Sequence, residues 1–406
     1  MSNPELMLAC HENFPTSRGA CMRLNSGRVL SCAYAGFTYS DDGGMAWCPP
    51  YEGRYVDGSL PKLQNLVDLG DGRIGGTEIR PLPGAVIRYH RYMGWTTSND
   101  MGKTWSEPRQ MGAVMIPAHA FQNVLLRLSS GRILLPCYFG VGQKNKPDEP
   151  RPLLGTWDGS GAFVGTEAHH YDPSFSSCYV LYSDDNGETW RMNSDGEIHI
   201  FMPPDILFAN TAEPSVAEVK PGVLTMMMRT KLGRPFQSWS YDNGENWTRP
   251  KPTHLASSNS PVVIQKLPAN GHLVCVWNQA GEKDIQDGHI RTRLSAAVSR
   301  NGGSIWEFFQ NVESIHEESR VEPGPIRFTA PHGRYPFTPG MAAYENDGRF
   351  TGDLKTSQRW TNHTICALED RVLILYSGRC KVLPLKWFYR GGDPFGENLY
   401  FRKLAT

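Results

Sequence analysis

A glutamate and an arginine on either side of a tight turn are the residues best placed to do chemistry. In NTAEPSVAEVKPGVLTMMMRT, Glu213 and Arg229 flank a turn centred on Gly222. Arg229 ends the apolar run LTMMM, where a charged group is costly unless it is paired or faces a polar hollow. A guanidinium can bind a carboxylate through two parallel hydrogen bonds, which an ammonium cannot do. The pattern predicts either a ligand-facing arginine or a structural salt bridge.

Histidines and cysteines offer further candidates. His119, in IPAHAFQNVLLRL, precedes an apolar hairpin, where it could bind substrate hydroxyls, act as a base or be a structural histidine. His169 and His170 lie near Asp172, but adjacent histidines rarely converge on one ion, so we expect a solvated loop there. The nine cysteines are scattered and form no CxxC pair, which predicts buried free thiols. We therefore expect no metal and no cofactor.

A repeated motif indicates how these residues are positioned. The pattern S-x-D-x-G-x-x-W occurs four times, and a fifth copy has Asn in place of Asp. In a hairpin turn, Asp or Asn accepts backbone hydrogen bonds, Gly supplies a positive φ, and Trp packs beneath the loop. The copies are 58, 85, 57 and 59 residues apart and begin at Ser40, Ser98, Ser183, Ser240 and Ser299. Five self-capping turns at near-even spacing indicate a repeat architecture.

Six apolar hairpins support the same count. Each reads as strand, tight turn, strand, and five of them precede one of the repeated turns. They centre near Gly27, Gly72, Gly131, Gly222, Gly271 and Asp370. Two hairpins in each of six units predict an all-β fold, a six-bladed β-propeller with four-stranded blades. A β-sandwich with recurrent turns is the alternative.

We expect a single propeller domain over residues 1–406 with two insertions. The first insertion, at about residues 141–176, interrupts the third blade, and the second, at about residues 310–358, separates the fifth and sixth blades. Loops of this length are usually functional or disordered. They either rim the central funnel or decorate the surface.

Composition excludes several classes of protein. The chain has 41 basic and 41 acidic residues, and this balance argues against a broad nucleic-acid surface or a polybasic membrane anchor. No apolar stretch approaches the roughly 20 residues that a membrane span needs. The N-terminus has neither the basic start nor the apolar core of a signal peptide, so we expect a cytoplasmic protein, although a trimmed secreted chain would read the same way. The oligomeric state is left open.

With these motifs the chain resembles the sialidase (neuraminidase) superfamily of six-bladed propellers, as a divergent member, over about residues 15–390. The repeated turn resembles that superfamily's Asp-box, or BNR repeat, which lies away from the active site and so implies no catalytic role here. The resemblance implies three arginines that bind the substrate carboxylate. It also implies a Tyr nucleophile polarised by a Glu, and an Asp that serves as the general acid and base.

The resemblance selects the arginines blade by blade. In blade four it selects Glu213 and Arg229. In blade five, RTRLSAAVS resembles the superfamily's arginine strand, which selects Arg291 and leaves Arg293 as a solvated neighbour. Blade one lacks the usual Arg-Ile-Pro, and Arg18 is the nearest equivalent, displaced by one position.

The acid is assigned in the segment after the first repeated turn. PPYEGRYVDGSLPKL offers Asp57 as the candidate acid. Glu78 and Arg80, in GGTEIRP, are expected to be ordinary exposed loop charges.

Blade six departs most from the superfamily. Where a tyrosine is expected, the chain reads RWTNHTICALEDRVLILYS, with Asn362 and His363 at that place. We predict that Asn362 binds substrate, together with His119. Tyr335, or Tyr344, could supply the nucleophile from the second insertion, whereas Tyr376 ends an apolar strand and is expected in the core.

These assignments predict an exo-acting glycoside hydrolase that cleaves a terminal acidic sugar, such as sialic acid or a uronate. One alternative is a polysaccharide lyase that acts on a uronate by β-elimination, with His119 or a tyrosine as the base. Another is a carbohydrate-binding propeller without turnover. The expected partner is an acidic carbohydrate or glycan, with no nucleic acid and no membrane.

Overall fold

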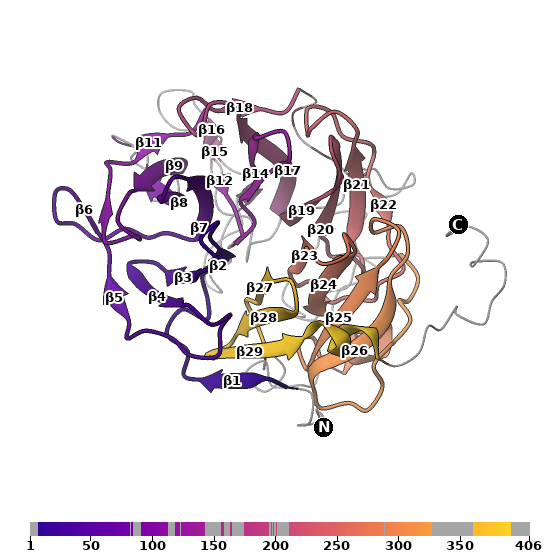
Figure 1. Ribbon diagram of the computed structural model, residues 1–406. Coiled ribbons are helices and arrows are strands. Elements are labelled where there is room, and N and C mark those ends of the chain that lie inside the picture. The colour runs from indigo at the N-terminus through magenta and orange to yellow at the C-terminus, as the bar shows by residue number, and fades with distance from the viewer. Residues whose placement is uncertain are drawn as a thin grey trace, which may run out of the picture.

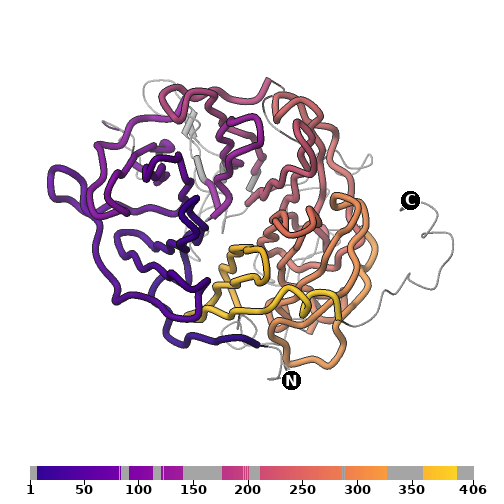
Figure 2. The backbone as a smooth tube through the Cα atoms, in the orientation of Figure 1, coloured from indigo at the N-terminus to yellow at the C-terminus, as the bar shows by residue number. Residues whose placement is uncertain are grey.

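The chain folds into a ring of small antiparallel sheets around a central axis (Figures 1 and 2). The computed structural model describes residues 7–81, 83, 91–112, 118–121, 123–142, 156–157, 163–164, 174–194, 196, 198, 200, 211–287, 289–326 and 360–390.

The larger sheets are the blades, and the first strand of each blade lies nearest the axis. Blade one contains β2 (Ala20–Arg23), β3 (Val29–Ala33), β4 (Gly36–Ser40) and β5 (Tyr51–Glu52). Blade two contains β7 (Asn65–Gly70), β8 (Arg73–Pro81), β9 (Arg91–Ser98) and β11 (Arg109–Gln110). Blade three contains β13 (Leu126–Arg127), β14 (Ile133–Gly142), β17 (Ser174–Ser183) and β18 (Arg191–Met192). Blade four contains β19 (Ala212–Lys220), β20 (Val223–Arg229), β21 (Phe236–Ser240) and β22 (Lys251–Pro252). Blade five contains β23 (Val262–Lys266), β24 (Leu273–Asn278), β25 (Arg293–Ser299) and β26 (Glu307–Ser314). Blade six contains β27 (Thr364–Ala367), β28 (Arg371–Tyr376), β29 (Arg379–Pro384) and β1 (Ala9–Glu12). The prediction of an all-β, six-bladed propeller is confirmed.

Blade six is completed from both ends of the chain. Its outer strand, β1, pairs antiparallel with β29, so that Ala9 lies opposite Val382. The five repeated turns each connect the third and fourth strands of one blade. In blade six these two strands come from opposite ends of the chain and have no connecting turn. This explains why the sequence carries six hairpins but only five repeated turns.

The repeated turns cap themselves as predicted. In each of them the Ser hydroxyl donates to the Asp or Asn side chain at 2.7–2.9 Å, and the Gly N–H donates to the Ser hydroxyl at 2.7–2.9 Å. In four turns the Trp ring N–H donates to the Gly carbonyl. In the fifth, Trp306 Nε1 has no partner in the described part of the chain. These turns fix the outer strands of the blades.

The first strands of the blades run in the same direction. Contacts join the first strands β2 to β7, β7 to β13, β19 to β23, β23 to β27 and β27 back to β2. Blade three contacts blade four through its second strand, β14, which packs against β19. Hydrogen bonds across this inner ring link residues at similar positions along their strands, since Ile264 N donates to Ser215 Oγ at 3.0 Å and Ala367 N donates to Gln265 Oε1 at 2.7 Å. Strand direction alternates within a blade, so first strands begin, and second strands end, at one edge of the ring. We call this the site edge.

A few elements lie outside the blades. β6 (Arg54–Tyr55) pairs in parallel with β10 (Thr104–Trp105), β12 (Ala118–His119) extends blade three, and β15 (Thr156–Trp157) pairs with β16 (Phe163–Val164). A short helix, α1 (Glu282–Gln286), precedes β25, and a 3₁₀ helix (Leu385–Tyr389) follows β29. Most of the two predicted insertions lies outside the described residues, and the second begins after Ser314, because β26 continues to that residue.

The cysteines and the helices bear on other predictions. All nine cysteines are free thiols, seven of them buried, as the sequence predicts. Within the described residues, neither helix has the length and apolar character needed to cross a bilayer. In the same residues, no three His, Cys, Asp or Glu side chains gather in a way that could hold a metal ion. The histidines at 169 and 170 lie outside the described part.

Candidate functional site

A buried ion pair lies in blade four at the site edge. Glu213 is the second residue of β19, and Arg229 is the last residue of β20. Arg229 Nη1 donates to Glu213 Oε2 at 2.7 Å, and Arg229 Nε donates to the Asn259 side-chain oxygen at 2.8 Å. Both charged residues are buried, where an ion pair holds only if its geometry is good and its hydrogen bonds are made.

A break in strand register places the carboxylate of this pair. Ala212 lies opposite Arg229, but the register shifts between Ala212 and Ser215. Glu213, between them, has a φ of 42°, in the left-handed region that a non-glycine residue rarely adopts. Such outliers persist where the surrounding structure imposes them, and they concentrate at functional sites.

A second arginine lies beside this pair. Arg291 precedes β25, is partly buried, and interacts electrostatically with both Arg229 and Glu213. Its Nε has no hydrogen-bond partner among the described residues. The pKa of Arg291 is lowered to about 10, mainly by burial and also by the charge of Arg229, while Glu213 opposes the shift. The group stays protonated at neutral pH, so within the described part of the cluster two cations lie near one carboxylate, which leaves an excess of positive charge.

His363 of blade six completes the cluster. It is fully buried and directly precedes β27, the first strand of its blade. Burial lowers its pKa to about 4, and the charge of Arg291 acts in the same direction. Glu213 opposes the shift, as does the backbone of Val276, which lies nearby without meeting hydrogen-bond geometry. His363 is therefore a neutral imidazole beside a cationic group.

The segment before His363 is tied to the arginine of blade five. Trp360 N donates to the Arg291 carbonyl oxygen at 3.3 Å, and Asn278 Nδ2 donates to the Trp360 carbonyl oxygen at 2.9 Å. Asn362, the predicted substrate-binding residue, is half-buried with a φ of 52°. The predicted role of Asn362 in substrate binding stays a prediction, and the neighbouring His363 interacts electrostatically with Arg291. No pattern in the sequence marked Asn259.

The neighbour of Arg291 has a different environment from the one predicted. Arg293 was expected to be solvated, and this is wrong: it is only 1% exposed. Its Nη1 donates to Asp284 Oδ2 at 2.9 Å, and its Nη2 lies 3.7 Å from Glu318 Oε2. Asp284 belongs to α1, which lies outside the strand pattern from which the prediction was made. Arg293 is thus paired with a carboxylate, although its Nε, like that of Arg291, has no hydrogen-bond partner among the described residues.

Blade one presents its candidates to solvent. Arg18 is exposed just before β2, and no hydrogen bond or ion pair joins it to another described residue. Asp57 is also exposed, and the hydroxyl and backbone N–H of Ser59 donate to it at 2.6 and 2.8 Å. These two bonds hold the pKa of Asp57 below its usual range. The resting group is a carboxylate that must gain a proton before it can act as an acid.

The charges of blade two are not the exposed loop charges that were expected. Glu78 and Arg80 both lie within β8, and Glu78 is buried. Glu78 accepts from Arg80 Nη1 at 2.9 Å and from the Lys62 backbone at 2.7 Å. Through Lys62, the pair anchors the segment between β6 and β7 onto the end of β8.

The remaining candidates are a histidine and three tyrosines. His119 lies in β12 opposite Tyr138, and its side chain is outside the described part of the structure. Tyr335 and Tyr344 also lie outside the described residues. Tyr376 is in the core, as predicted, and its hydroxyl donates to Glu313 Oε1 at 2.6 Å. Burial, with the charge of Glu313, raises the pKa of Tyr376.

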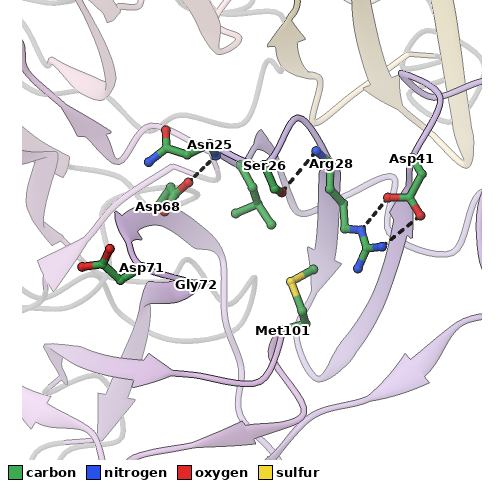
Figure 3. Close-up of a pocket in the computed structure, with 9 residues that line it drawn as sticks. Asn25, Ser26, Arg28, Asp41, Asp68, Asp71, Gly72 and Met101 are labelled. Carbon is green, nitrogen blue, oxygen red and sulfur yellow. Dashed lines mark hydrogen bonds and ion pairs between the residues drawn. The ribbon is translucent and has the colours of Figure 1, made fainter.

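Two cavities lie apart from this cluster. A cavity of about 460 Å³ opens between the turns that join β2 to β3 and β7 to β8, at the opposite edge of the ring (Figure 3). Its Arg28 is held by both oxygens of Asp41 at 2.6 and 2.9 Å. A smaller cavity of about 210 Å³ is lined by the first strands of blades three to six. No predicted site residue lines either one.

The ring of blades and its five turns define a BNR-repeat propeller. The BNR repeat-like domain family matches residues 83–322, more than half of the chain, and the chain belongs to this family.

Solved structures with the same fold include sialidases. A Hadza microbial sialidase, Hz136, is 15% identical with a TM-score of 0.55, over 94% of this chain and 67% of its own. The Trypanosoma rangeli sialidase in complex with 2,3-difluorosialic acid is 11% identical with a TM-score of 0.51, over 92% of this chain and 54% of its own. A protein of unknown function from Dyadobacter fermentans is 14% identical with a TM-score of 0.52, over 93% of this chain and 97% of its own. At these identities the likeness establishes the sialidase-like fold.

Proposed function

We propose that this protein is a glycoside hydrolase that releases a terminal acidic sugar, such as sialic acid, from a glycan. The sugar's carboxylate would bind to Arg229 and Arg291 at the site edge. The observation that carries the proposal is the charge imbalance among the described residues of the cluster, where two guanidinium groups lie near the one carboxylate of Glu213. An incoming carboxylate would balance the charge and accept hydrogen bonds from Arg291.

The burial of the cluster supports binding of an anion. Charge-assisted hydrogen bonds from a guanidinium are stronger where water is excluded and where the partner is planar. Burial of the cluster meets the first condition, and a sugar carboxylate meets the second. Arg229 already donates hydrogen bonds from Nη1 to Glu213 and from Nε to Asn259, so its orientation is fixed before a ligand binds. Fixed donors need little reorganisation when the ligand binds.

Glu213 and Asp57 are the proposed catalytic carboxylates. Glu213, beside the arginines, would stabilise positive charge that develops on the sugar ring or activate the nucleophile. Asp57 would protonate the leaving oxygen. Since the bonds from Ser59 favour the ionised form, we expect hydrolysis to be faster at acidic pH, where more of Asp57 carries a proton.

A panel of glycosides with acidic or neutral terminal sugars tests this function. The wild-type protein should release only the acidic sugars, and Glu213→Gln should abolish turnover while a non-hydrolysed acidic sugar still binds. Release of neutral sugars at the same rate would contradict the proposal. An unsaturated, ultraviolet-absorbing product would identify a lyase instead, and binding without any product would identify a carbohydrate-binding propeller.

A further inference from the structure

A two-residue turn in blade one carries a backbone outlier. Tyr34 and Ala35 join β3 to β4 between the paired residues Ala33 and Gly36. Tyr34 has a φ of 56°, whereas Ala35 is not among the residues with positive φ. Glycine is the usual residue at the first central position of such a turn, since a side chain is strained there. A bulky aromatic residue is a marked exception.

The strain at Tyr34 is not offset by burial of its ring. The side chain is 57% exposed, so it contributes little apolar burial to folding. The backbone is held by an antiparallel bridge to Leu63, whose carbonyl oxygen accepts from Tyr34 N at 3.0 Å. A strained residue with an exposed side chain at a fixed place points to a role in function.

The turn lies at the site edge, beside the segment that carries Arg18. Tyr34 directly follows the end of β3, and Arg18 and Gly19 precede β2, so all three lie at one edge of blade one. Gly19 packs so closely that an added Cβ would lie 2.7 Å from Ala33 Cα. Lys62 precedes Leu63, the bridge partner of Tyr34; it is exposed, and no interaction joins its ammonium to another described residue. Two exposed basic residues therefore lie in the segments that adjoin this turn.

We propose that Tyr34 is a stacking platform for the sugar that adjoins the terminal acidic sugar. An exposed tyrosine ring can cover the apolar C–H face of a pyranose, and its hydroxyl can bond to sugar hydroxyls. Arg18 and Lys62 favour a glycan that carries further negative charge. Tyr34 thus sets specificity for the linked glycan, whereas Arg229 and Arg291 bind the terminal sugar. This inference rests on the proposed function and names a second subsite of the same site.

The experiment compares two substrates with the same terminal sugar. One is an oligosaccharide in which the acidic sugar is linked to further sugars, and the other is the glycosyl fluoride, whose leaving group is too small to reach a second subsite. Tyr34→Ala should lower kcat/KM for the oligosaccharide about tenfold, mainly through KM, and leave the fluoride unchanged. Tyr34→Phe should retain most of the wild-type value, because it keeps the ring.

Two further variants separate function from folding. Tyr241 is 68% exposed, lies in a repeated turn away from the site edge and has no positive φ, so Tyr241→Ala should leave both substrates unaffected. Tyr34→Gly should lose the same oligosaccharide activity as Tyr34→Ala. It should also melt at the wild-type temperature or about 1–2 °C higher, because glycine removes the strain.

The outcomes distinguish this inference from the proposed function. If the wild-type protein cleaves both substrates and Tyr34→Ala changes neither, or changes both equally, the platform is wrong and the proposed function stands. If the wild-type protein cleaves neither substrate, the proposed function fails and the platform fails with it.

Discussion

Arg291 and Arg293 lie two residues apart in blade five and have opposite environments. Arg293 is fully buried and bonded to Asp284 at 2.9 Å. Arg291 is partly buried, and the charges of the described residues that act on it are another arginine and that arginine's carboxylate. The Nε atoms of both Arg291 and Arg293 lack a partner among those residues, so the difference lies in the carboxylate that each arginine has. The first cation has a carboxylate of its own in α1, and the second lies near a carboxylate that already pairs with Arg229.

The difference teaches how a structural cation can be told from a ligand-binding one. A buried arginine paired with its own carboxylate contributes to stability, because removing the partner leaves an isolated charge. An arginine held near a second cation costs stability, and the fold keeps it when an anion from outside completes the site. The predictions below test this distinction from the largest expected effect to the smallest.

Loss of Arg291 should affect activity most. We expect Arg291→Ala to lower kcat/KM for an acidic glycoside by about 100- to 1000-fold, or about 3–4 kcal/mol, because a preorganised charge contact is removed. The free energy of unfolding should not fall, since the repulsion from Arg229 is relieved. Steady-state kinetics and urea unfolding measure the two effects. If Arg291→Ala kept the wild-type kcat/KM, or if its free energy of unfolding fell, Arg291 would be a structural cation like Arg293.

Loss of the partner of Arg293 should affect stability most. Asp284→Asn keeps the shape of the side chain but removes its charge, which leaves Arg293 without its close partner. We expect the free energy of unfolding to fall by about 3 kcal/mol, with kcat/KM per folded molecule unchanged. Urea unfolding and kinetics on the same preparation check this. Wild-type stability would mean that Glu318, at 3.7 Å, suffices to hold Arg293.

The neutral histidine beside Arg291 should give the protein a pH-dependent stability. The pKa of His363 is about 4 in the folded state and about 6.5 in the unfolded state. Between these values the unfolded chain binds a proton that the folded chain does not, so stability is full above pH 6.5 and falls as the pH falls toward 4. We expect about 2 kcal/mol to be lost between pH 7 and pH 5.

The control for this prediction is a variant that cannot titrate. His363→Phe should show a correspondingly smaller loss of unfolding free energy over the same pH range. An unchanged slope in His363→Phe would mean that other groups set the acid stability and that His363 is not the neutral neighbour of Arg291.

The exposed arginine of blade one should show the smallest effect. Arg18 has no partner among the described residues but also no burial, so water competes for it. We expect Arg18→Ala to lower kcat/KM by about tenfold and to change the free energy of unfolding by less than about 0.5 kcal/mol. A loss as large as that of Arg291→Ala would place Arg18 within the carboxylate site itself.

The repeated turns predicted most of the fold because their chemistry is local. Each turn caps itself with residues inside one short segment, so the sequence alone reveals the repeat, and the six apolar hairpins give the number of blades. The pairing of β1 with β29 was not predicted, because it joins the two ends of the chain and leaves no local pattern. The missing sixth turn was its only trace.

The candidate site was predictable where charge and strand pattern coincide. Arg229 and Glu213 lie at the ends of paired strands, and the structure brings them together as one of the two predicted alternatives, a salt bridge. Arg293 was misplaced because its partner comes from α1, a short helix without a sequence signature. His363 was named but not chosen as the site residue. Side chains alternate between the two faces of a strand but not in a loop, so the sequence does not show which of two adjacent loop residues is buried.

Calorimetry with a free acidic sugar tests the central claim most directly. The titration would compare sialic acid with its carboxamide, which keeps the shape and removes the charge, against wild-type protein, Arg291→Ala and Tyr241→Ala. We predict that the wild type and Tyr241→Ala bind the acid about 100-fold more tightly than the amide, and that Arg291→Ala binds the two equally. Equal binding of acid and amide by the wild type, or an undiminished preference in Arg291→Ala, would contradict a carboxylate site at this pair of arginines.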